Sequence, residues 1–304
     1  MPFVEKTKRK HGDRVDGHWV RDAGGMNVIM TGLYPNRADC EICSFNELDV
    51  TELLKFIKKH NDENPDKKIG FFHCMIAALV RLTNDRRKLN RFVRHGRIYE
   101  RDEITVSFVA KREFADAGGR VIVTYKAKKD DNVESVAEYI KGEVTGVRKE
   151  TTASKETRKK SKNITQSLDA YAKWPRWFLL LVTRLMRMLD AYGKVPKKIR
   201  QGDPAFTSIL IANLGSIKAD SIYHHLNNYG TNSMMITVGT LHQKEVTNED
   251  GTKEVRDFVD MSLNADERIA DGFYFIHSMR ILEKYLQNPD KLMLKFDEDV
   301  VFED

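Results

Sequence analysis

Apolar residues recur along the chain at two spacings, and each spacing predicts its own kind of element. Buried helices are predicted over residues 71–82 and 273–286, because residues three and four positions apart lie on the same face of a helix. Runs rich in alternating and β-branched residues predict strands instead. The predicted strands cover residues 38–47, 97–99, 104–110, 121–125, 234–241 and 255–263, with a strand and its turn over 206–215.

Two further helices and a hairpin complete the predicted elements. Asp49 and Thr51 are expected to cap a helix, and apolar residues between Val133 and Ile140 mark another. The turn at residues 248–251 is expected to join two of the strands into a hairpin.

The composition is that of a soluble globular protein, with 41% apolar and 32% charged residues. The net charge of +6 would suit a nucleic acid or an anionic membrane as a partner. However, the 45 acidic residues are interspersed with the 51 basic ones, and no stacking-aromatic or base-recognition motif accompanies them. We therefore expect no nucleic-acid partner.

The cysteines and the N-terminus both indicate a reducing compartment. Met1–Asp16 is charged and has no apolar core, so it is not a secretory signal, and we expect a cytoplasmic protein. Cys40 and Cys43 form a CxxC spacing, but residues three apart on a strand point to opposite faces. No second CxxC completes a zinc site, so we interpret the cysteines as structural and expect no metal.

The polar residues 1–25 are expected to form a loosely packed arm that docks on a neighbour or on the domain surface.

One motif stands between a predicted strand and a predicted helix, where sites are often built. The residues from Asp266 to Gly272 read Asp-Glu-Arg-Ile-Ala-Asp-Gly. The motif resembles the Asp-His-Arg-x-x-Asp-Gly active-site motif of the catalytic domain of 2-oxoacid dehydrogenase acyltransferases and, more remotely, that of chloramphenicol acetyltransferase. Asp266, Arg268, Asp271 and Gly272 match, as does Pro289 after the helix, but Glu267 stands in place of the catalytic His.

A second stretch resembles the same family. Asn213-Leu214-Gly215 matches the end of the family's Phe-Thr-Ile-Ser-Asn-Leu-Gly signature, and Ala212 then stands in place of the Ser. The element order also agrees from residue 26 to residue 290. The resemblance implies a two-layer α/β sandwich of the chloramphenicol acetyltransferase type, with a mixed sheet and helices on one face. It further implies one catalytic-type domain over residues 26–304, with an insertion at about 148–205.

The family transfers acyl groups to or from coenzyme A, in trimers whose active sites lie between subunits. Its His removes a proton from the attacking group, and its Ser hydroxyl stabilises the oxyanion, contributions of roughly 10²–10⁴ and 10²–10³ in rate. This chain lacks both groups. Glu267 is therefore either an altered general base or a structural residue paired with Arg268 or Arg37. Asp271 is expected to pair with Arg37, to cap the following helix, or both. Among the histidines, His277 lies nearest to the motif in sequence, whereas His73, His224 and His225 are weaker candidates.

The most apolar segment, residues 174–192, lies in the predicted insertion, after a piece at 148–163 that we expect to be solvated. It is too short and too charged to span a bilayer, which takes about 20 apolar residues. Three interpretations remain: a cover on the domain's own core, a lid or subunit contact, and a peripheral membrane contact with basic flanks at Lys173 and Lys194. Its polar residues fall along one helical face; these are Arg176, Thr183, Arg184, Arg187 and Asp190.

The sequence thus predicts an acyltransferase-family protein that transfers or binds an acyl group from acyl-CoA with a rebuilt active site. The alternative is a non-catalytic homotrimer that acts as a scaffold or ligand sensor. A third hypothesis is a protein held at a membrane surface through residues 174–192. Coenzyme A binding would separate the first reading from the second.

Overall fold

The structure, a computed structural model, describes residues 3, 8–111, 120–152, 171, 173–200, 203–248 and 250–302. The strands are β1 Gly17–Trp19, β2 Glu41–Asp49, β3 Arg91–Arg94, β4 Arg97–Arg101, β5 Thr105–Lys111, β6 Arg120–Lys126, β7 Ile209–Asn213, β8 Met234–Thr247 and β9 Lys253–Asp266. The helices are α1 Gly25–Leu33, α2 Thr51–Glu63, α3 Phe71–Asp85, α4 Val133–Thr152, α6 Arg176–Ala191, α7 Lys197–Arg200 and α8 Gly272–Gln287.

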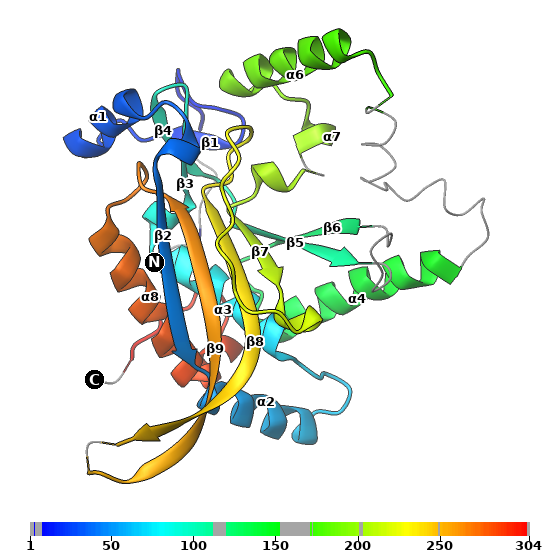
Figure 1. The fold of residues 1–304 in the computed structure, drawn as a ribbon, viewed down its shortest axis with the longest axis vertical. Helices are drawn as coiled ribbons and strands as arrows, with labels where there is room; N and C mark the ends of the chain where they lie inside the picture. The colour runs from blue at the N-terminus through cyan, green and yellow to red at the C-terminus, as the bar shows by residue number, and fades with distance from the viewer. Residues whose placement is uncertain are drawn as a thin grey trace.

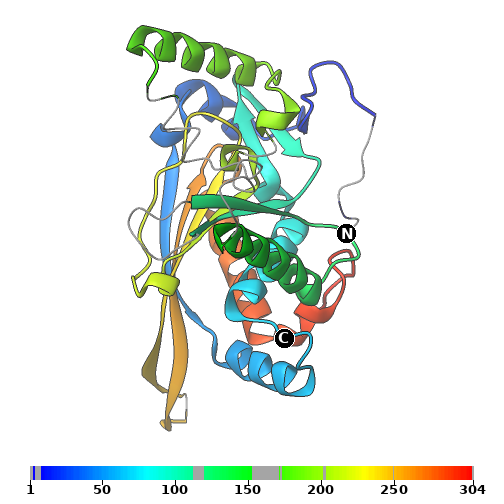
Figure 2. The same cartoon turned by 90° about the vertical axis from the view of Figure 1, so that its right-hand side faces the viewer.

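Six strands form one mixed sheet in the order β2-β9-β8-β7-β5-β6. Strand β7 runs parallel to β5 and β8, whereas the other neighbours are antiparallel. Helices α2, α3, α4 and α8 contact strands of this sheet and lie on one of its faces, as Figures 1 and 2 show from two directions. The predicted two-layer α/β sandwich, with a mixed sheet and helices on one face, is confirmed.

The main core lies between the sheet and these helices. Helix α3 is apolar on nearly every side and buries Met75, Ile76 and Leu79 completely or almost so. The inner-facing residues of β8 and β9, such as Val238 and Met261, meet it from the sheet. Burial of a large apolar side chain stabilises the fold by about 1.5–3 kcal/mol, so this layer holds the sheet and its edges in register.

The N-terminal segment docks on the domain surface. Strand β1 pairs with β4, which pairs with β3, in a second, three-stranded sheet. Just before β1, the buried Arg14 lies over the rings of Phe92 and Tyr99. The predicted division into an arm, a domain and an insertion remains a prediction.

The region predicted as an insertion contributes α6 and α7. Residues 148–152 continue α4, and the rest of the predicted solvated piece lies outside the described residues. The inner side of α6 packs on a small cluster of its own, formed by Val195, Ala205 and Phe206. Among the described residues, α6 contributes none to the main core cluster, so it does not cover that core. No helix in the described ranges is long and apolar enough to cross a membrane.

Candidate functional site

Asp266 is the centre of the turn that carries the motif. It ends β9, is completely buried, and accepts bonds from the Arg268 Nε at 2.8 Å and Nη2 at 2.7 Å. Arg37 donates to the same carboxylate from Nε at 3.4 Å. One carboxylate held by two guanidiniums fixes the direction in which the chain leaves the strand.

The two arginines also tie distant segments to this turn. Arg37 donates to the carbonyls of Asn227 at 2.6 Å and Gly230 at 3.1 Å. Arg268 donates to the carbonyl of Tyr34 at 2.7 Å, and the Asn27 side chain returns a bond to the Arg268 carbonyl at 3.0 Å. Burial lowers the pKa of Arg37, and the Asp266 carboxylate opposes that shift.

The guanidinium of Arg37 bonds to Asp266 and not to Asp271, so the predicted Asp271–Arg37 pair is wrong. Asp271 lies at the start of α8, is exposed, and accepts a bond from the Tyr274 backbone N–H at 2.8 Å. Asp271 caps α8, as the sequence analysis also predicted. Arg37 instead lies beside Asp266, whose position at the end of a buried strand offers the carboxylate that a buried guanidinium requires.

Glu267 is half-buried and follows Asp266 directly. Its backbone N–H donates to the Cys40 carbonyl at 3.0 Å. Within the described part of the chain, no side chain bonds to its carboxylate, and the expected pairing with Arg268 or Arg37 is wrong because both guanidiniums are directed at Asp266. Nearby, burial and the carboxylates of Asp266 and Glu267 raise the pKa of Cys40 to about 11, so its thiol is protonated at neutral pH.

The second signature forms a tight turn at the far end of β7. Asn213 accepts a bond from the Ser216 N–H at 3.1 Å, which closes the turn. A Cβ on Gly215 would lie 2.4 Å from the Gly239 carbonyl oxygen, so only glycine permits this approach to β8. Ala212, which the resemblance aligns with the family's Ser, carries a methyl group and no hydroxyl. Its register partner on β8 is Thr237, whose hydroxyl is engaged by the Ile222 backbone.

The sheet register separates the two signatures within one protomer. Ala212 lies opposite Thr237, which lies opposite Ser262 on β9. Glu267 follows Ser262 by five residues, a span of roughly 16 Å along an extended strand. Ala212 and Asn213 of one chain therefore do not reach the same reacting atom as Glu267 of that chain.

The histidines are distributed over different surfaces. His277 is exposed on α8 and stacks on Phe273, and His73 is half-buried near the start of α3. His224 and His225 belong to a segment that crosses the sheet surface: the His224 N–H donates to Asn264 at 3.0 Å, and the Leu226 N–H donates to Glu41 at 2.7 Å. The sequence did not predict this crossing, because no local pattern of residues indicates hydrogen bonds from the backbone of a segment to side chains of a strand forty residues away.

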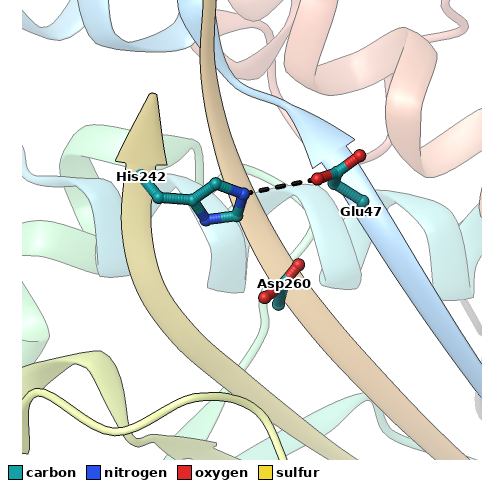
Figure 3. Close-up of side chains that lie close together, drawn as sticks. All are labelled: Glu47, His242 and Asp260. Carbon is teal, nitrogen blue, oxygen red and sulfur yellow. Dashed lines mark hydrogen bonds and ion pairs between the residues drawn. The ribbon is translucent and has the colours of Figure 1, made fainter. Parts of the chain in front are cut away.

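Three side chains that could ligate a cation meet on the exposed sheet face. Glu47 of β2, Asp260 of β9 and His242 of β8 place one ligand atom each within 4.8 Å of one another. Figure 3 shows the pair between His242 and Glu47, at 3.3 Å. Lys244 contacts the other oxygen of Glu47 at 2.7 Å, and these two contacts lower the pKa of Glu47. The lysine and the histidine already act on Glu47, so we assign the group to surface ion pairing.

A cavity of about 670 Å³ lies between the N-terminal segment, the β5–β6 pair and α7. Its charged lining contains more cations than anions, which suits an anionic ligand group. The cations are Arg9, Arg101, Lys126, Lys197 and Arg200, and the anions are Asp16, Asp102 and Glu103.

The chain is similar to known proteins in sequence over part of its length and in fold over most of it. Residues 194–294 match the family model described as 2-oxoacid dehydrogenases acyltransferase (catalytic domain). Among curated proteins, none matches the sequence. A probable dihydrolipoamide acetyltransferase from Listeria monocytogenes is similar in structure, with a TM-score of 0.56 at 15% identity over 93% of this chain and 95% of that one.

Two further structures have the same fold. The cubic core of the pyruvate dehydrogenase multienzyme complex aligns with a TM-score of 0.56 at 12% identity, over 91% of this chain and 95% of that one. A dihydrolipoamide acetyltransferase from Azotobacter vinelandii, studied for the roles of a serine, a histidine and an asparagine in its catalytic mechanism, gives 0.56 at 13%, with the same coverage. The resemblance predicted from the two signatures is thus confirmed: the chain matches the acyltransferase catalytic domain of the 2-oxoacid dehydrogenases in sequence over residues 194–294 and has its fold.

Proposed function

We propose that the protein is a homotrimer that binds acyl-coenzyme A between protomers and transfers the acyl group, with Glu267 as the general base. The Glu267 carboxylate takes the proton of an acceptor thiol or hydroxyl while the acceptor's sulfur or oxygen attacks the thioester carbonyl. The bond from the carbonyl carbon to the coenzyme A sulfur then breaks, and the leaving thiolate takes up that proton. The acyl group and the proton have exchanged places, and no other reactant is consumed.

The observation that carries this proposal is the position of Glu267. The Asp266 carboxylate and its two arginines hold the turn rigidly, and Glu267 occupies the place of the family's His without a partner for its own carboxylate in the described structure. An unpaired, half-buried carboxylate beside a fixed backbone is free to accept a proton from a substrate.

A second protomer is needed because the two signatures lie far apart within one chain. The surface around the motif is suited to such a contact. Met26 and Ile29 on α1 are 73% and 59% exposed, and Phe273 and Ile276 on α8 are 82% and 56% exposed. Exposed apolar residues gathered around a site are typical of a subunit interface.

The acyl donor is proposed on chemical grounds as well as on family resemblance. Coenzyme A carries several phosphate charges, and Lys197 and Arg200 in the lining of the cavity near α7 would suit such groups, although Arg200 also lies 3.7 Å from Asp16. No metal is required for the proposed step.

Two experiments test the proposal. Calorimetry with coenzyme A and a panel of acyl-CoAs should detect micromolar binding, and Glu267→Gln should keep that binding while lowering acyl transfer by roughly 10²–10⁴. In a mixing experiment, protomers with Glu267→Gln are combined with protomers carrying Asn213→Ala, which removes the side chain that closes the turn of the second signature. Each variant alone should form inactive trimers, and refolding them together should restore part of the activity. Activity that does not return on mixing would place both residues in sites within single chains.

The alternative, a non-catalytic homotrimer that senses or scaffolds, is favoured by one observation. Ala212 supplies no oxyanion donor, and the hydroxyl of Thr237 is already engaged. Trimer formation without binding of any acyl-CoA would support this alternative over the transferase.

A further inference from the structure

The outward side of α6 is apolar. Trp177, Leu181, Leu185 and Met188 follow one another at helical spacing and so share one face, which we call the outer stripe. Their exposed fractions are 69%, 56%, 47% and 52%. A contiguous row of large exposed apolar side chains marks a surface that is covered in the working protein.

The opposite side of α6 is anchored, which fixes the outer stripe in its outward direction. Asp190 is completely buried and accepts bonds from Arg94 and from the Gly230 backbone N–H, the latter at 2.9 Å. Arg14 donates to the Asp190 carbonyl and lies 3.5 Å from its carboxylate. Figures 1 and 2 show α6 along one end of the molecule, and none of the helices and strands that the structure describes lies outside it. The helix therefore cannot turn its apolar side inward without breaking a buried ionic cluster.

The exposed charges of residues 173–200, the segment that contains α6, are all positive. Arg176, Arg184 and Arg187 are exposed along one flank of the outer stripe. Between residues 173 and 200 the only acidic residue is Asp190, which is buried, whereas Lys173, Lys194, Lys197 and Lys198 add to the positive charge. An apolar stripe bordered by arginines and by tryptophan matches the interface of an anionic bilayer, where phosphates lie beside the acyl chains.

We propose that α6 docks the protein on the surface of an anionic phospholipid bilayer. The outer stripe enters the boundary between headgroups and acyl chains, and the arginines contact lipid phosphates. We favour a bilayer over a protein partner because every exposed charge between residues 173 and 200 is positive, whereas protein interfaces usually carry a polar rim without one dominant sign of charge. The inference is tested separately from the acyl-transfer proposal, since the variants that test it alter no residue of that site.

Sedimentation with vesicles tests this proposal. The full-length protein should bind vesicles of phosphatidylcholine mixed with phosphatidylglycerol about tenfold or more tightly than vesicles of phosphatidylcholine alone, and added salt should weaken the binding. Arg184→Glu with Arg187→Glu should remove that preference. Leu181→Gln with Leu185→Gln should abolish binding and the blue shift of tryptophan emission that accompanies it.

The matched control is Val255→Gln, which removes a 62% exposed apolar side chain from β9, away from α6. It should bind vesicles as the unaltered protein does. Circular dichroism and thermal unfolding show whether each variant folds. If the leucine variant does not fold, the charge-reversal variant still tests whether α6 binds anionic vesicles. Absence of binding to the mixed vesicles would overturn the proposal. So would a leucine pair that changes the size of the oligomer, because the outer stripe would then be a contact between protomers.

Discussion

Arg37 donates to the Asp266 carboxylate across 229 residues of sequence, in a site where both side chains are almost fully buried. The pair joins the segment after α1 to the end of β9, and Arg268 completes it from the other side. The turn that presents Glu267 is therefore positioned by a buried ionic cluster that joins its two neighbours, Asp266 and Arg268, to the distant Arg37.

Removing the central carboxylate should destabilise the protein strongly. Asp266→Ala leaves two guanidiniums buried without their partner, and breaking a buried pair in this way costs about 3–5 kcal/mol of unfolding free energy. Asp271→Ala loses only a helix cap, worth about 1 kcal/mol. Urea denaturation of the two variants measures the difference. Equal losses would show that Asp266 contributes no more than a cap.

Restoring the family's catalytic groups should raise activity. Glu267→His with Ala212→Ser is expected to increase acetyl transfer to a thiol, because it supplies a neutral base and an oxyanion donor. The control is Glu267→Gln with Ala212→Ser, which adds the donor without a base. If the first variant forms no more acetylated thiol product than the control, the substrate channel itself is incompetent.

The turn after β7 should not tolerate a side chain. Gly215→Ala places a Cβ 2.4 Å from a β8 backbone oxygen, and the forced shift should cost about 1–3 kcal/mol. Gly32→Ala, in α1, meets nothing within 4 Å and should instead stabilise by roughly 0.5–1 kcal/mol. Thermal unfolding compares the two. A neutral Gly215→Ala would mean that the two strands can separate there freely.

Stability should fall on acidification through His73. Burial lowers its pKa to about 4, and its Nδ1 accepts a bond from the Gly70 N–H at 3.0 Å, which protonation removes. Between pH 6.5 and 4 the unfolded chain binds a proton that the folded one does not, so the contribution is full above pH 6.5 and is lost as the pH falls.

The slope should stay below the roughly 1.4 kcal/mol per pH unit of a fully buried group, because His73 is partly exposed. His73→Gln should flatten the pH profile of unfolding in that window. The control His277→Gln, at an exposed histidine, should leave it unchanged. An identical slope in both variants would assign the acid sensitivity to other groups.

Local pattern was sufficient for most of the elements. The spacing of apolar residues predicted the helices that became α2, α3 and α8 and the hairpin of β8 and β9, because side-chain periodicity depends only on the element's own geometry. The two signatures also predicted the fold, since Asp266 to Gly272 and Asn213 to Gly215 are read directly from the sequence.

Tertiary structure decided which groups meet. Two aspartates of the motif were equally available to Arg37 in the sequence, and the buried end of β9 selected Asp266 while the exposed start of α8 left Asp271 as a cap. The cross-strand register and the irregularity between Val238 and Leu241 brought Glu47, Asp260 and His242 together.

The orientation of α6 was likewise beyond the sequence. Its amphipathic pattern allowed either side to face inward, and only the arginines that reach Asp190 from β3 and from the N-terminal segment turn the apolar stripe outward. Periodicity is a property of one element, whereas burial and charge pairing depend on segments that are distant in sequence. The sequence alone therefore determined the elements, and only the folded structure decided which elements and side chains contact one another.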